Sequence, residues 1–253
     1  MSVDRGPVVA NAGVMKLFGV ISPADLAAAA LFALCWIAYE PVLRRLTRGQ
    51  PATINTHMAV IRTAWMRSMA RREARFLDGQ LLGHAITSAT FFASSNLIVI
   101  AAAAGALFGG DRVLRSVQVA PLVAGAPQLL LKIKLALVVA VLGRSLLSFI
   151  WSIRQMNYCL AAIGAAPDPS SPPERLKAYG EAAGEVLNPA LSTFNSGVRG
   201  YYFALAAGAW LLGPVAFALI TLLAVGLLAW RQFSSRSAVG VRKLRALLEE
   251  SEP

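Results

Sequence analysis

The sequence has few charged residues, few cysteines and few histidines. Only 15% of its 253 residues are Asp, Glu, Lys or Arg, whereas a soluble domain usually carries about 25%. The two cysteines form no CxxC pair, so nothing supports a disulfide framework or a thiolate metal site. The two histidines, His57 and His84, fall in segments that we expect at different depths. We therefore expect no metal site and no haem.

Recognisable catalytic motifs are also lacking. The chain has no GxSxG motif, no P-loop, no HExxH motif and no pair of carboxylates within one apolar segment. We expect neither enzymatic activity nor a cofactor.

Lys and Arg outnumber Asp and Glu by 24 to 13. This excess accompanies nucleic-acid binding in some proteins and cytoplasmic membrane loops in others. Because 57% of the residues are hydrophobic and occur in long blocks, the second interpretation is favoured. We expect a lipid bilayer with anionic headgroups as a partner, and no nucleic acid.

The apolar block 81–108 contains 28 residues and no charged side chain. Since roughly 20 apolar residues cross a bilayer, it predicts a membrane-spanning helix. Hydroxyl groups in such a helix can bond to the carbonyl four residues earlier, and small residues let other helices approach. Seven polar residues in the block predict a central helix that others surround: His84, Thr87, Ser88, Thr90, Ser94, Ser95 and Asn96.

The fold class that these patterns predict is an all-α, polytopic transmembrane helix bundle forming one domain over residues 1–253. We expect four spans, at 24–43, 81–108, 130–154 and 200–230. A basic amphipathic helix is expected at 55–78 and a C-terminal tail at 231–253. Eight arginines in 44–80 predict that this loop is cytoplasmic and the N-terminus outside, in a bacterial inner membrane.

The C-terminal half leaves two topologies open. Residues 164–200 are expected to form a second inner loop with a short amphipathic helix from Glu174. The block 200–230 is too long for an upright span and contains Gly213-Pro214, so it is either one tilted or kinked span or a hairpin. Four spans would leave the basic tail outside, whereas a hairpin would return it inside.

Arg144 is the most informative charged residue. If Lys132 and Arg154 mark the two interfaces, the span contains 23 residues, about 34 Å, with Arg144 at the midplane. A charge there costs roughly 2.5–3.5 kcal/mol and usually faces a cavity or a partner. Alternatively, the span is shifted and Arg144 reaches the interface.

A possible anion pathway follows from the depth of Arg144. Hydroxyl and amide groups facing a cation at one depth would replace the hydration shell of an anion. Residues of the central span could extend the lumen along one stripe, although hydrogen bonds between helices would give the same spacing. The candidates are Arg144, Ser94, Ser95, Asn96, Ser88, His84 and Gln80.

Several short motifs resemble a known family. They are Arg62-x-x-Trp65, Phe91-Phe92-Ala93-Ser94-Ser95, Trp151-Ser152-x-Arg154-Gln155-x-Asn157-Tyr158, Gly197-x-Arg199-x-Tyr201-Tyr202-Phe203 and Trp210-x-x-Gly213-Pro214. The chain resembles, over about 55–235, a bacterial and plant family of integral membrane proteins known only as a domain of unknown function. The resemblance implies several spans and no particular activity. It also implies a role in folding or function for Arg62, Trp65, Gln80, Arg154, Asn157, Arg199 and Tyr202.

Two functions agree with these patterns. The first is a channel or transporter for a small anionic solute. It would be oligomeric, because four spans from one copy form only a thin wall for a pore. The alternative is a non-catalytic accessory or scaffold subunit of a larger membrane complex, in which polar stripes only hold helices together. Flux through liposomes distinguishes the two.

Overall fold

The computed structural model describes residues 21–46, 53–110 and 127–250, and within these ranges the fold is all-α, without strands. Its elements are α2 (Pro23–Leu46), α3 (Ile54–Ala70), α4 (Phe76–Phe108), α6 (Gln128–Gly164), α7 (Pro173–Ala209), η1 (Trp210–Leu212), α8 (Pro214–Phe233) and α9 (Arg236–Glu250).

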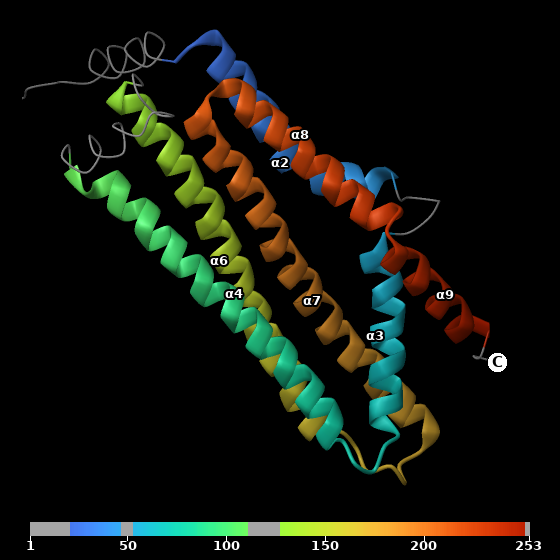
Figure 1. The fold of residues 1–253 in the computed structure, drawn as a ribbon. Coiled ribbons are helices and arrows are strands. Elements are labelled where there is room, and N and C mark those ends of the chain that lie inside the picture. Colours follow the sequence, from blue (N-terminus) through green and yellow to red (C-terminus); the bar gives the residue numbers. More distant parts are fainter. Residues whose placement is uncertain (1–20, 47–52, 111–126, 251–253) are drawn as a thin grey trace, which may run out of the picture.

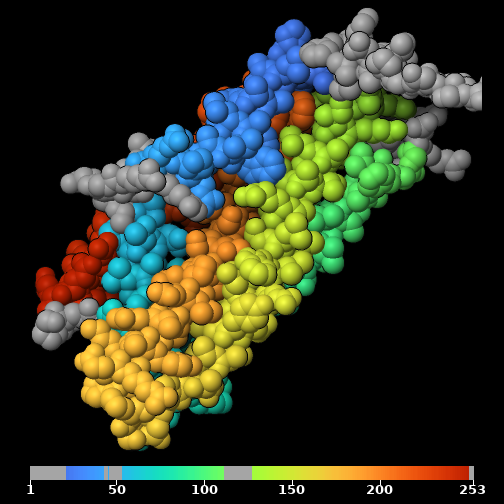
Figure 2. All heavy atoms as spheres, turned by 180° about the vertical axis from the view of Figure 1, so that it is seen from behind, coloured from blue at the N-terminus to red at the C-terminus, as the bar shows by residue number. Residues whose placement is uncertain are grey.

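The long helices form an antiparallel bundle (Figure 1). α4, α6 and α7 lie side by side, α8 packs against the upper part of α7, and α2 packs against α8. α3 and α9 lie at the ends of α2 and α8. Figure 2 shows α2 over the upper part of the opposite face, with the lower parts of α6 and α7 uncovered. Four segments are long and apolar enough to span a membrane: Pro23–Val42, Phe76–Phe108, Gln128–Gly164 and Pro214–Glu250. The predicted polytopic all-α bundle is thus confirmed.

The predicted inner loop at 164–200 is wrong. Most of that segment belongs to α7, a continuous helix of 37 residues that packs along both α6 and α3. Close approach to α3 depends on two glycines spaced one turn apart. A Cβ on Gly180 would lie 2.5 Å from Cα of Arg67, and one on Gly184 would lie 2.9 Å from Oγ1 of Thr63. The segment is polar, but its small residues bury a helical face.

Of the two alternatives for 200–230, the hairpin describes the structure. α7 ends in η1, and Gly213 then adopts φ +121°, a conformation that side-chain-bearing residues rarely reach. Pro214 begins α8, where its missing N–H leaves no hydrogen bond unmade. α8 therefore runs back along the bundle (Figure 1).

The hairpin removes the charge conflict in the predicted topology. Because α7 returns the chain between α6 and α8, the basic helix α9 lies beside α3, at the same end of the bundle. Arg245 Nη1 of α9 lies 3.3 Å from His57 Nδ1 of α3. The basic amphipathic helix itself is shorter than predicted, ending at Ala70.

Candidate functional site: a polar cleft between α2, α6 and α7

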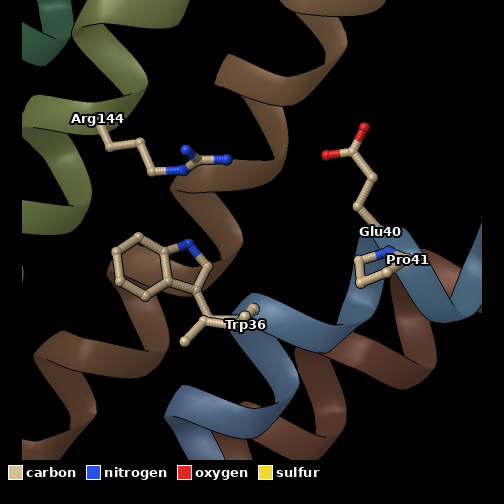
Figure 3. A pocket seen from close by; sticks show the side chains of 5 residues that line it. Trp36, Glu40, Pro41 and Arg144 are labelled. Atoms are coloured by element: carbon tan, nitrogen blue, oxygen red, sulfur yellow. The ribbon is translucent and has the colours of Figure 1, made fainter.

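A cavity of about 420 Å³ opens between α2 and α6. On α2, Trp36 and Glu40 are one turn apart and therefore point the same way. Arg144 extends from α6 with its guanidinium 5.9 Å from the centre of the Trp36 ring (Figure 3). This geometry is a cation–π contact, which holds the arginine at the cavity without neutralising it.

The inner part of this cleft is a second, smaller cavity of about 30 Å³, whose wall is formed by α2, α6 and α7. On α7, Arg199 Nη2 lies 3.4 Å from Glu40 Oε2, and its guanidinium is 5.9 Å from the centre of the Tyr39 ring. Ser145 and Ser148 of α6 and Ser196 of α7 also line this inner wall. Hereafter "the cleft" means the space bounded by Trp36, Glu40, Arg144, Arg199 and these three serines.

The charges in the cleft do not cancel. Arg199 forms an ion pair with Glu40. Arg144 is exposed and forms no ion pair with any acidic residue in the described parts of the chain. Two guanidinium groups therefore face one carboxylate, surrounded by hydroxyl groups. Such a site attracts a small anion and offers it hydrogen-bond donors.

The floor of the cleft is a close helix contact. A Cβ on Gly200 of α7 would overlap the side chain of Ser145 on α6, and a Cβ on Gly197 would lie 2.7 Å from the Phe149 ring. The hydroxyl of Ser145 donates to the Val141 carbonyl at 3.0 Å within α6. The two glycines thus allow α7 to lie directly against α6 at the floor of the cleft.

Arg144 does not face the predicted polar group of the central span. It points toward α2, whereas Asn96 of α4 is buried against α6 and its Nδ2 donates to the Leu142 carbonyl at 2.9 Å. Ser94 is exposed and Ser95 is half-buried on α4. The structure therefore places Arg144 in one cavity wall with Ser148 of the same helix, but not with these three residues of α4.

The remaining pathway candidates lie on the outer surface of α4. Gln80, His84 and Ser88 are exposed, and the Ser88 hydroxyl donates back to the His84 carbonyl at 3.0 Å. Thr87 and Thr90 make the same bond to carbonyls four residues earlier. Within one copy of the described chain, these side chains line no lumen with Arg144.

The residues that the family resemblance singled out fall into three places. Arg62 and Trp65 lie on α3, where Trp65 Nε1 donates to the fully buried Asp78 carboxylate at 2.6 Å. Burial lowers the pKa of the Arg62 guanidinium to about 10, so it stays charged at neutral pH. Arg199 lines the cleft. Gln80 on α4 and Arg154 and Asn157 on α6 are exposed, and Tyr202 on α7 is half-buried.

Sequence reasoning missed a second polar group inside the apolar part of the bundle. Asp25 at the start of α2 is buried and accepts hydrogen bonds from Trp210 Nε1 at 2.7 Å and from the Ser22 hydroxyl at 2.6 Å. Lys134 of α6 is also buried, with its Nζ 5.7 Å from the centre of the Trp210 ring. We call Ser22, Asp25, Lys134 and Trp210 the buried polar group. No local signal reveals it, because Trp210 arrives only through the hairpin.

Comparison with known proteins identifies the class. Residues 27–237 match the family described as "Protein of unknown function, DUF599". The chain is a helical protein with membrane-spanning segments, and it belongs to that family. No curated protein and no solved structure matches it.

Proposed function

We propose that the protein conducts or transports a small anion across the membrane, with the cleft as the anion-binding part of the path. The observation that carries the proposal is Arg144, a guanidinium that lines a cavity of about 420 Å³ beside an apolar helix and has no ion pair with the described residues. A charge in such a place is costly unless it faces water or a ligand. This departs from the sequence-based hypothesis in one respect, since α7 rather than α4 supplies the partner groups.

Arg199 and Glu40 are suited to regulate access. Their 3.4 Å ion pair spans from α7 to α2 at the inner wall of the cleft. An anion approaching Arg199 competes with Glu40, so entry of the anion would loosen the contact between the helices. We place the end with α3 and α9 on the cytoplasmic side, because basic segments are retained there. Assembly of several copies remains part of the proposal.

Flux into liposomes tests the proposal. Purified full-length protein is reconstituted, and uptake of chloride and nitrate is compared with uptake of potassium. We expect anion uptake, a decrease of at least ten-fold in Arg144→Gln, and loss or reversal of selectivity in Arg144→Glu. Arg175→Gln is the control, since it removes an exposed arginine of α7 that lines neither part of the cleft. A wild-type protein that passes neither anions nor potassium would overturn the proposal.

The alternative, an accessory subunit of a membrane complex, makes the opposite prediction. It expects no flux from the purified chain, together with recovery of the protein in a stable complex with other membrane proteins. Exposed apolar side chains on α4 and α8, among them Phe91, Ile98, Val215 and Leu223, suit such contacts as well as they suit lipid.

A further inference from the structure

A second cavity lies at the elbow where α8 passes into α9. Its volume is about 720 Å³, and its walls come from α7, α8, the start of α9 and the first residue of α3. This elbow cavity lies on the other side of Arg199 from the cleft, because Arg199 lines both. A space of this size accommodates a group much larger than a single small anion.

The walls of the elbow cavity carry positive charge and hydroxyl groups. Arg199, Arg231 and Arg236 line it, and none of its described lining residues is acidic. Arg231 donates to the Tyr202 hydroxyl, and Arg236 forms no ion pair within the described chain. Ser234, Ser235 and Ser237 add three hydroxyl groups. Guanidinium groups and hydroxyls are the donors that recognise phosphate oxygens.

The start of α9 adds to the same field. α9 begins at Arg236 with no acidic residue in its first turn, and the Ser235 side chain accepts the Ala238 N–H at 3.1 Å. The positive end of the helix dipole therefore lies at the wall where Arg236 and Ser237 are found. An acidic residue is the usual neutraliser at such an end, so its absence leaves the field available to a ligand.

An apolar strip leads along α8 toward this cavity. Leu219, Leu223, Leu227 and Trp230 recur at intervals of three or four residues, and each is at least 40% exposed. Trp230 then forms part of the cavity wall, at the last turn of the span-forming helix α8. An acyl chain lying on the strip would bring the lipid headgroup to the arginines. A free phosphate ion would have no use for the strip, so the strip favours a lipid as the ligand.

From this geometry we propose that the elbow cavity binds the phosphate-bearing headgroup of an anionic phospholipid, with one acyl chain along α8. The side chain of Gln232 also lines the cavity, and its amide can exchange hydrogen bonds with a glycerol hydroxyl next to the phosphate. Phosphatidylglycerol is therefore the probe of choice. Arg199 lines both cavities, but Arg231 and Arg236 do not line the cleft, so variants of these two arginines test the lipid site separately from transport.

Binding is measured on the full chain in uncharged detergent micelles, by native mass spectrometry with phosphatidylglycerol and, separately, phosphatidylcholine. We expect the double variant Arg231→Gln, Arg236→Gln to bind phosphatidylglycerol at least ten-fold more weakly. The control double variant Arg175→Gln, Lys243→Gln removes the same charge from exposed positions on α7 and α9 and should bind like wild type. Equal losses in both double variants would overturn the site in favour of general attraction to charge.

A second measurement does not depend on the arginine variants. Phosphatidylglycerol with brominated acyl chains quenches nearby tryptophans, and Trp230→Phe should remove the largest part of the quenching among the five single Trp→Phe variants. An unchanged quenching amplitude would overturn the acyl-chain placement.

A third measurement uses inorganic phosphate as a competitor of the lipid. If it displaces the lipid at equal concentration, the cavity binds free phosphate and the lipid proposal fails. Because no flux is measured, these results do not depend on the transport proposal.

Discussion

The buried polar group and the cleft hold the same kinds of side chain in opposite states. In the buried polar group, Asp25 and Lys134 are each only 5% exposed, and the carboxylate accepts two side-chain hydrogen bonds. In the cleft, Arg144 is exposed and has an aromatic ring rather than a carboxylate as its partner. Both cations lie over a tryptophan ring, Lys134 over Trp210 and Arg144 over Trp36, so burial and the hydrogen-bonded carboxylate of Asp25 set the two sites apart. A buried, hydrogen-bonded charge fixes helix positions, whereas a charge open to a cavity remains available to a ligand.

The difference comes from how the helices approach one another. At the buried polar group, the hairpin brings Trp210 against the start of α2, and the Trp210 ring stacks on Phe217 with centroids 4.9 Å apart. At the cleft, α2 meets α6 and α7 through Trp36 and Tyr39, whose rings leave space between the helices. The comparison predicts that stability is concentrated at the first site and ligand binding at the second.

The largest effect is expected from Asp25→Ala. The substitution removes the carboxylate, so the Trp210 N–H loses its acceptor and the Ser22 hydroxyl loses its bond to Asp25. Hydrogen bonds to a charged group contribute about 1.5–3 kcal/mol each. Thermal unfolding in detergent should show this loss. The milder Asp25→Asn variant can still accept a hydrogen bond from Trp210, so its stability should lie between those of wild type and Asp25→Ala. A loss below that of Arg144→Ala would contradict the comparison.

A smaller loss is expected at the floor of the cleft, from Gly200→Ala. Its methyl group would overlap Ser145, and overpacking of a tight contact costs about 1–3 kcal/mol. Ser145→Gly in the same chain should recover most of the loss, because it removes the overlapping side chain. The matched control is Gly143→Ala on α6, where a Cβ meets nothing within 4 Å. Differential scanning fluorimetry of the four proteins checks the set, and equal effects of both alanines would refute the close contact.

The sequence predicted the elements that depend on long apolar blocks and missed those that depend on small residues. Residues 81–108 and 130–154 are recognisable as spans because hydrocarbon burial requires uninterrupted apolar length. α7 was overlooked because its first half is polar, although Gly180 and Gly184 mark a face that approaches α3. A scan for small residues spaced four apart would have found it.

The candidate site was predictable only in part. Arg144 could be recognised as a candidate site residue from its position between Lys132 and Arg154, because a charge within a span is unusual however the helices pack. Its neighbours could not be selected, because they depend on which face of α6 meets which helix. Ser94 and Asn96 lie at a plausible depth on α4, yet α2 and α7 occupy the side that Arg144 faces. Depth follows from hydropathy, but rotation about the helix axis follows from packing.

The smallest change in stability is expected from Glu40→Gln, which tests whether the cleft differs in kind from the buried polar group. The Glu40 side chain is 41% exposed and its ion pair with Arg199 is 3.4 Å long, so solvent screening limits its contribution to about 0–1 kcal/mol. Loss of the carboxylate raises the positive field at both arginines. We therefore expect unfolding within about 1 kcal/mol of wild type, together with tighter binding of nitrate or chloride, measured by calorimetry on the purified chain. A loss of several kcal/mol would mean that the cleft carries fold stability as the buried polar group does. Unchanged stability without tighter anion binding would instead show that Arg144 and Arg199 do not act on an anion together.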